Sequence, residues 1–235
     1  MSSKKIIYMQ GVDKFEGNVA SFEPKLQPDD MLSIIVSAEN PELTVPFNMP
    51  QIQVEYDVNK SQSSIKTYLI DSDGYINYPL IGHVKVAGLS KFEANELLVG
   101  KISGYFKTTP TVSLELLNFK ISVLGEVKLP NVYDVKSDRI TILEAISRAG
   151  DLTIFGKREN VLIIRELNGK KTFNRVNLTK PDFINSPFYY LKQNDIIIVE
   201  PNKTHINNGA VGANISTILT SASILITLLF YFIKK

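Results

Sequence analysis

Histidines, which often bind metal ions or transfer protons near neutral pH, are few in this chain and lie far apart. His83 and His205 are the only histidines, and neither has a carboxylate at the spacing of a metal ligand. Asp71 and Asp73 could form a metal or acid/base pair, yet they lie in a segment ending at Gly74, where aspartates hydrogen-bond their own backbone. We therefore interpret the histidines as surface residues and the aspartates as turn residues.

No motif of a known reaction is present in the sequence. The chain has no GxSxG nucleophile elbow, no HExxH zinc motif, no phosphate-binding Walker loop and no dinucleotide-binding glycine pattern. Cysteine is absent, which excludes disulfides, thiolate metal sites and a cysteine nucleophile. We therefore expect no catalytic residues, no metal site and no cofactor, and we predict that the protein is not an enzyme.

Basic side chains gather around one expected hairpin in the second half of the chain. Two interpretations stay open: contact with acidic sugars or phosphate, and a solvated, charged edge strand, which is the more common use of such residues. The net charge is only +2, so a broad positive surface for nucleic acid is not expected. The clustered residues are Lys157, Arg158, Lys170, Lys171 and Arg175.

The C-terminal segment has the composition of a membrane-spanning helix. Residues 215–233 carry no charge and are followed by Lys234 and Lys235. A helix of this length spans about 28 Å, and the hydrocarbon core of a bilayer is about 30 Å thick. We predict a single transmembrane helix within residues 208–235.

Small and hydroxyl-bearing residues fall on one face of that expected helix. At about 100° per residue, the hydroxyl-bearing positions lie within an arc of about 60°. A plain anchor helix, close pairing of helices through small residues, and a ring of helices around an aqueous lumen all remain possible. We predict the lumen, lined by Gly209, Gly212, Ser216, Thr220, Ser223, Thr227 and Lys234.

The candidate residues before the C-terminal segment lie in two similar modules. Each module is expected to consist of strands, then one helix, then further strands. Residues Ser90–Glu93 and Thr141–Glu144 both have the form of a capping box, which starts a helix. The first module is expected to contain a strand over 31–36, a hairpin of 66–70 with 75–80, a helix from 90 to 106, and a strand over 111–117. The second is expected to contain strands over 120–124 and 195–200, a helix from 141 to 150, and a hairpin of 161–166 with 171–176.

These modules are too small for doubly wound sheets, so the expected fold class is α+β: two small mixed α/β modules and one C-terminal transmembrane helix. The expected boundaries are an N-terminal tether over 1–21, modules over 22–118 and 119–203, and a membrane helix over 208–235.

Specific segments resemble the outer-membrane polysaccharide export proteins of the Wza type. The opening strand motif of that family resembles Leu26–Leu32, with Asp29 in place of the usual glycine. Its core motif resembles Asp73–Gly82, followed by Val86–Ser90 and Glu93–Ala94. The β-grasp module called SLBB resembles Val123–Val127 with Pro130, followed by Thr141–Ile146 and Ala149–Gly150. The resemblance covers about residues 22–203, with one SLBB module where larger members have several.

The resemblance implies a ring-shaped homo-oligomer that passes capsular or exopolysaccharide across the bacterial outer membrane and faces mostly the periplasm. It also implies an inner-membrane partner, a chain-length regulator and tyrosine kinase known as the co-polymerase, and contact with membrane lipid. Family members are usually lipoproteins, and Met1 stands where a lipidated cysteine is expected.

Two other functions remain open. One is a periplasmic scaffold anchored in the inner membrane, which Lys234 and Lys235 favour because flanking lysines prefer the cytoplasmic side. The other is a glycan-processing enzyme, which needs two convergent carboxylates.

Overall fold

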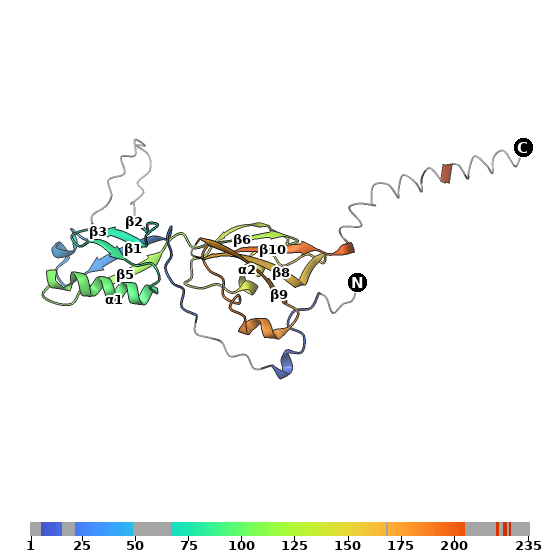
Figure 1. Ribbon diagram of the computed structural model, residues 1–235, viewed down its shortest axis with the longest axis horizontal. Coiled ribbons are helices and arrows are strands. Elements are labelled where there is room, and N and C mark those ends of the chain that lie inside the picture. The colour runs from blue at the N-terminus through green and yellow to red at the C-terminus, as the bar shows by residue number, and fades with distance from the viewer. Residues whose placement is uncertain are drawn as a thin grey trace, which may run out of the picture.

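The protein is described by a computed structural model over residues 6–15, 22–48, 67–167, 169–204, 220, 223, 224 and 226. Met1, His205 and most of the expected membrane segment 208–235 lie outside the described residues. Within these described parts, no helix has both the length and the apolar character needed to cross a membrane. The fold is a mixed α/β arrangement of two bodies (Figure 1). The first has a three-stranded and a two-stranded sheet with helix α1, and the second has a five-stranded sheet with helix α2.

The first body is built on a three-stranded antiparallel sheet, with helix α1 lying along it (Figure 1). Inward and outward side chains alternate along these strands, so that one face builds a core containing Leu32, Leu98 and Tyr78. The sheet has the order β2 (Thr67–Leu69), β1 (Met31–Ser37) and β5 (Thr111–Leu116); the other elements are β3 (Tyr75–Tyr78), β4 (Gly82–Lys85), α1 (Lys91–Ile102) and the short 3₁₀ turns Pro41–Thr44 and Ser103–Tyr105.

The expected hairpin of 66–70 with 75–80 is wrong in its pairing. The tight turn exists, because Gly74 adopts a φ of 89° and the Asp71 carboxylate accepts the backbone N–H groups of Asp73 and Tyr75. However, β2 pairs with β1, whereas β3 pairs with β4 in a separate two-stranded sheet. The carbonyl of Gly74 accepts the N–H groups of Val86 and Ala87, which fixes β3 next to β4 instead.

The second body is built on a five-stranded sheet that holds one parallel pair, β6 with β10. Its inner face and helix α2 bury a second core that includes Ile121, Ile163 and Ile197. The sheet has the order β7 (Asn131–Asp134), β6 (Lys120–Gly125), β10 (Ile196–Pro201), β8 (Gly156–Leu167) and β9 (Lys170–Val176); α2 is Ile142–Arg148, and the 3₁₀ turn Pro181–Asn185 follows β9.

Both expected helix starts are confirmed. The Ser90 hydroxyl accepts the N–H of Glu93, while the Glu93 carboxylate accepts the N–H of Ser90; Thr141 and Glu144 repeat the arrangement. Each box satisfies two backbone donors that a helix start leaves without partners. The pairing of Lys25 with Glu93, followed by the Ser90 N–H, lowers the pKa of the Glu93 carboxyl to about 2.

Residues 6–15, within the expected N-terminal tether, make hydrogen bonds to the second body. The N–H groups of Met9 and Gln10 donate to the carbonyls of Leu178 and Thr179, 3.1 and 2.8 Å away. The Tyr8 hydroxyl donates to Asp151. This segment, which also holds the 3₁₀ turn Val12–Lys14, therefore packs against the second body.

Candidate functional site

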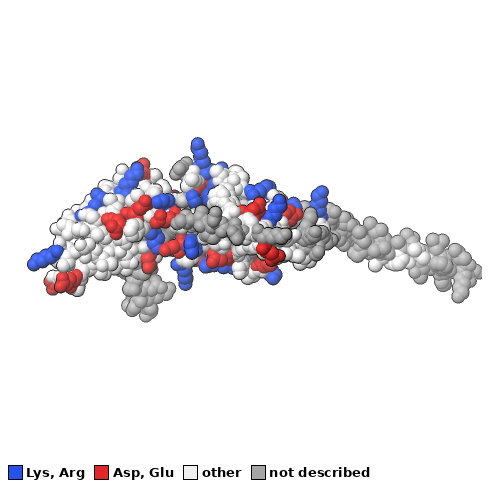
Figure 2. Space-filling view, turned by 90° about the horizontal axis from the view of Figure 1, so that it is seen from below, with Lys and Arg blue, Asp and Glu red and all other residues white. Residues whose placement is uncertain are grey.

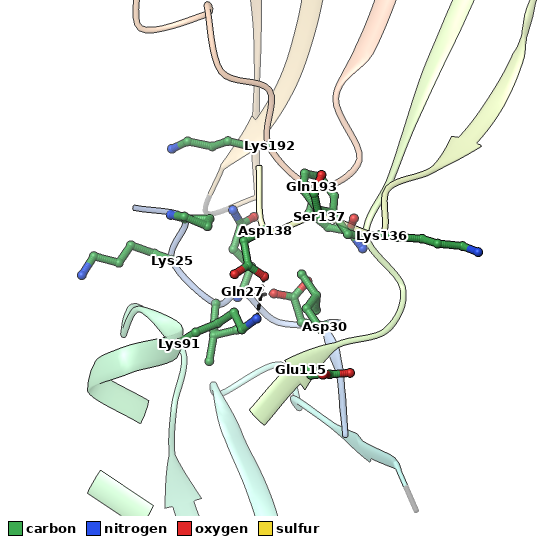
Figure 3. Close-up of a pocket in the computed structure, with 14 residues that line it drawn as sticks. Lys25, Gln27, Asp30, Lys91, Glu115, Lys136, Ser137, Asp138, Lys192 and Gln193 are labelled. Carbon is green, nitrogen blue, oxygen red and sulfur yellow. Dashed lines mark hydrogen bonds and ion pairs between the residues drawn. The ribbon is translucent and has the colours of Figure 1, made fainter. Parts of the chain in front are cut away.

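A pocket of about 280 Å³ lies where the two bodies meet (Figure 3). The first body contributes the chain before β1, the start of α1 and the end of β5. The second contributes the segment after β7 and the segment before β10. The lining is Pro24, Lys25, Leu26, Gln27, Asp30, Lys91, Glu115, Leu116, Phe119, Lys136, Ser137, Asp138, Lys192 and Gln193.

Asn118 ties the two bodies together beside this pocket. Its side chain accepts the N–H of Met31 at 2.9 Å and donates to the carbonyl of Asp29 at 2.9 Å. The Gln193 amide donates to the carbonyl of Asn118 at 2.7 Å and accepts the N–H of Lys120 at 2.8 Å. Because these bonds join β1, β6 and the approach to β10, they hold both walls of the pocket in register.

The turn before β1 positions Asp30 in the pocket wall. Asp30 is only 2% exposed, and its Oδ2 accepts the N–H of Gln27 at 2.8 Å. Oδ1 has no hydrogen-bond partner among the residues that the structure describes. Asp29 adopts a φ of 69°, a conformation that favours glycine and that aspartate tolerates better than most residues, so this turn keeps its shape without the family's glycine.

Burial raises the pKa of the Asp30 carboxyl to about 6, although the N–H of Gln27 favours the ionised form. The folded protein therefore binds more protons than the unfolded chain between about pH 4 and 6, and Asp30 makes folding less favourable as pH rises through that window.

We expect Asp30→Asn to stabilise the protein by about 1–2 kcal/mol at pH 7, because asparagine keeps an acceptor for Gln27 and removes the buried charge. Thermal unfolding of both proteins from pH 4 to 8 measures the difference, which should vanish near pH 4. The matched control Asp29→Asn should show no such pH dependence. An Asp30→Asn protein that is less stable than the wild type at pH 7 contradicts the assignment.

Four lysines line the pocket, and two of them, Lys25 and Lys91, belong to ion pairs. Lys91 lies 2.5 Å from Asp138 and joins the start of α1 to the second body (Figure 3). Lys25 lies 2.7 Å from Glu93. For Lys136 and Lys192, the described residues provide no carboxylate within ion-pair distance. Partial burial, with a contribution from Arg165, lowers the pKa of Lys192.

The residues of the predicted basic cluster do not lie together, because strand β8 separates them into two groups. Lys157 and Arg175 share the carboxylate of Glu200, at 3.2 and 2.9 Å. Lys170 and Lys171 lie at the far end of the hairpin, about ten residues or roughly 33 Å along the strand from Lys157. A single contact with one sugar or phosphate cannot include both groups.

Arg158 does not fit the predicted role in contacting glycan or phosphate. It is 4% exposed, and its guanidinium donates to the carbonyls of Leu152 and Thr153, both at 3.2 Å. It also lies 5.0 Å from the ring centre of Tyr8. Strand alternation turns Arg158 toward the core, and it anchors the N-terminal segment instead of facing solvent.

The interpretations of His83, Asp71 and Asp73 as surface and turn residues agree with their surroundings. His83 is exposed on β4, and the Asp71 carboxylate is bonded to its own turn. Over the part of the chain that the structure describes, no group of three or more His, Cys, Asp or Glu side chains could hold a metal ion.

Of the predicted lumen-facing residues, only Thr220 and Ser223 are described. Both are helical, and the Ser223 hydroxyl donates to the carbonyl of Thr220 at 2.9 Å. Gly209, Gly212, Ser216, Thr227 and Lys234 lie outside the described residues.

Charge is evenly mixed over the face seen in Figure 2, where Lys and Arg alternate with Asp and Glu on both bodies. This agrees with the net charge of +2 and shows no single-sign surface on that face.

Two parts of the sequence match known protein families. Residues 19–117 match the family described as polysaccharide biosynthesis/export protein, and residues 120–172 match the SLBB domain. The chain therefore contains a polysaccharide biosynthesis/export region followed by an SLBB domain. The resemblance drawn from the sequence motifs is thereby confirmed, and the pocket lies where the export-family region meets the SLBB region.

Two known proteins are similar to different lengths of this chain. It is 28% identical to the EPS I polysaccharide export outer membrane protein EpsA of Ralstonia solanacearum over 180 residues, which is 74% of this chain and 47% of EpsA. It is 31% identical to the polysialic acid transport protein KpsD of Escherichia coli over 141 residues, which is 57% of this chain and 24% of KpsD. The chain therefore spans about half the length of EpsA and about a quarter of KpsD.

The pocket residues were not predicted from the sequence. They come from segments as distant as Lys25 and Gln193, and no local motif joins them. The one usable signal was Asp30 in the opening strand motif, because a carboxylate directly before a buried strand needs an explanation.

Proposed function

We propose that this protein is a non-enzymatic component of a capsular or exopolysaccharide export conduit, forming an oligomeric ring that passes polysaccharide across the outer membrane. The observation that carries the proposal is the succession of the two family matches, residues 19–117 and then 120–172. The names of EpsA and KpsD, which concern polysaccharide export and polysialic acid transport, support it.

The proposed organisation has four parts. A polysaccharide export domain over residues 22–118 and an SLBB β-grasp domain over 119–203 follow the N-terminal segment 1–21. A transmembrane helix over 208–235 comes after them. The separate cores of the two bodies support the boundary near residue 118. The uncharged run 215–233 supports the helix.

The proposed location is the outer membrane, with most of the chain facing the periplasm. The proposed partners are the polysaccharide, further copies of the chain, membrane lipid and an inner-membrane co-polymerase of the chain-length regulator and tyrosine kinase type.

A second candidate is a periplasmic scaffold that is anchored in the inner membrane and organises a synthase without forming a pore. Lys234 and Lys235 support it, because lysines flanking a helix favour the cytoplasmic side. Electron cryomicroscopy of the detergent-extracted protein separates the candidates, since the conduit requires a closed ring and the scaffold does not.

A glycan-cleaving function is not favoured, although the pocket contains carboxylates that sequence reasoning had not brought together. A glycoside hydrolase needs a proton-bearing carboxyl and a second carboxyl that is free to act as nucleophile or base. Asp138 is paired with Lys91 at 2.5 Å, and Glu115 points away from Asp30 (Figure 3). We therefore assign the pocket to binding.

The helix proposal predicts which positions reach water in the assembled protein. Single cysteines at Ser216, Thr220, Ser223 and Thr227 should react with a membrane-impermeant thiol reagent, because one polar face lines the lumen. Cysteines at Ile218, Leu225 and Leu229 are the matched controls and should stay protected. Equal protection of both sets supports an anchor helix, in which each hydroxyl bonds the preceding turn as Ser223 does.

A further inference from the structure

We propose that a second copy of this chain docks on the exposed face of the five-stranded sheet, using the exposed face of its own three-stranded sheet. The inference rests on the proposed function, because it names the surfaces that join neighbouring copies in the proposed ring. Its own basis is that each body covers one side of its sheet with a helix and leaves an apolar face on the other side (Figure 1).

The second-body face is the side of the five-stranded sheet that faces away from helix α2. Ile197 and Val199 of β10 point into the core, so strand alternation turns Ile196 and Ile198 to the other side. Each of these two residues is paired with an apolar residue on a neighbouring strand, which makes the patch continuous. The patch consists of Phe173, Ile164, Ile196, Leu162, Ile198 and Leu124.

The second-body face has the character of a protein interface. Phe173, its largest side chain, is 66% exposed. The ion pairs Lys171–Glu166 and Arg175–Glu200 border the patch at its two ends. Exposed apolar patches with a polar border mark sites of protein–protein contact.

The first-body face is the side of the three-stranded sheet that faces away from helix α1, and it supplies the matching surface. Met31 on β1 lies beside Leu69 on β2, and Ile35 follows on the same side of β1. Leu117 extends this row, because its N–H donates to the carbonyl of Met31 at 2.8 Å. The exposed fractions of these four side chains lie between 37% and 57%.

The presence of both faces in one chain identifies the occupant as a second copy. Contact between the first-body face of one copy and the second-body face of the next covers both apolar surfaces. Contact of either face with a copy of itself leaves the other face exposed. Because unlike faces meet, each copy contacts two neighbours, and head-to-tail contacts of this type generate rings when the rotation closes.

Charge also favours contact between unlike faces. Glu115 is the single charged residue of β1, β2 and β5, and its pairing with Ser33 places it on the first-body face. Strand β9, at the edge of the second-body face, carries Lys170, Lys171 and Arg175 and no acid. Contact between unlike faces therefore brings an acidic surface to a basic edge, which favours this pairing over pairing of like faces.

Cross-linking of single-cysteine variants tests which faces meet, because the chain has no cysteine of its own. Full chains with Leu69→Cys and full chains with Phe173→Cys, carrying different tags, are co-expressed, extracted in detergent and treated with a bis-maleimide. The mixture should give a cross-linked dimer that contains both tags. Each variant expressed alone should give about tenfold less dimer, since like faces do not meet in a head-to-tail contact.

The control mixture is Phe92→Cys with Phe173→Cys. Phe92 is 69% exposed and lies on α1, on the other side of the first body from the first-body face. This mixture should give no more dimer than Phe173→Cys alone. Equal yields from the Leu69 and Phe92 mixtures, or from like and unlike faces, overturn the proposal.

Phe173→Ser should raise the dissociation constant of the assembly about tenfold, because aromatic side chains buried on docking are typical anchors of an interface. Phe92→Ser removes a ring of similar exposure and should leave the dissociation constant unchanged. Both variants should keep the circular dichroism spectrum of the wild type, since each ring is exposed. Sedimentation equilibrium in detergent measures the difference. If the two variants weaken the assembly equally, the proposal fails.

Electron cryomicroscopy of the same extract separates failure of this proposal from failure of the proposed function. A closed ring without the mixed cross-link overturns the docking faces alone. The mixed cross-link without a closed ring supports the docking faces and overturns the conduit. Absence of any assembly overturns both.

Discussion

Replacing Arg165 with methionine is expected to lower the free energy of unfolding by about 3–5 kcal/mol, because it leaves the charge of Asp195 buried without a counterion. Asp195 is fully buried, and Arg165 is 6% exposed. Their closest atoms, Nη2 and Oδ2, lie 2.6 Å apart, and Nε lies 2.9 Å from Oδ1. Urea unfolding, followed by circular dichroism, measures the loss.

The same guanidinium also holds the segment before β10. It donates to the carbonyls of Pro187 and Tyr190, at 3.2 and 3.0 Å, and lies 4.8 Å from the ring centre of Phe188. Lys192 and Gln193 follow directly and line the pocket. Loss of Arg165 should therefore loosen one wall of the pocket as well as destabilise the second body.

Lys171→Met is the matched control for this prediction. Lys171 also pairs with an acid on a neighbouring strand, at 3.7 Å from Glu166, but both side chains are more than half exposed. Exposed pairs of this kind contribute about 0–1 kcal/mol. If Arg165→Met costs no more than Lys171→Met, the buried pair is not a determinant of stability. The double variant Arg165→Met with Asp195→Leu should recover part of the loss, because no unpaired charge remains.

Helix starts and the strand segments of the second body could be predicted because their signals are local. A capping box occupies four consecutive residues, and both boxes form as predicted, at Ser90 and Thr141. The hairpin of β8 with β9 was also predicted, since its turn and its alternating strands lie within one short stretch.

Strand pairing in the first body was not predictable in the same way. The turn at Gly74 was correct, yet β2 pairs with β1 over a long sequence separation, and β3 pairs with β4. Strands that follow one another in sequence are expected to pair when no other strand competes, but here β1 pairs with β2 and β4 pairs with β3. Which strands pair depends on the packing of the whole core, and no short sequence motif indicates it.

The residues of the candidate site were even harder to predict from local sequence signals. Arg158 was predicted to belong to the basic cluster because it neighbours Lys157, but strand alternation turns Arg158 toward the core and Lys157 outward. The pocket instead collects isolated lysines and Asp30 from five separate segments. Their proximity follows from the way the two bodies meet at Asn118, which no property of the individual residues encodes.

Gly125→Ala should be among the most damaging single substitutions in the second body. Gly125 ends β6 with a φ of 89°, and an added Cβ would lie 2.1 Å from the carbonyl oxygen of Val199 on β10. That oxygen accepts the N–H of Glu126 at 2.9 Å, so it cannot move away without breaking the parallel pairing of β6 with β10. We expect a loss of more than about 3 kcal/mol in the free energy of unfolding.

Gly169→Ala separates the two causes of that loss. Gly169 has a φ of 70°, close to that of Gly125, but an added Cβ meets no atom within 4 Å. It should therefore show only the cost of a left-handed conformation, about 1 kcal/mol. A loss at Gly125 that clearly exceeds the loss at Gly169 measures the contact with Val199, whereas equal losses contradict it. The first result gives a physical reason for glycine in the motif Val123–Val127, since the backbone of β10, paired in parallel with β6, leaves no room for a side chain at that position.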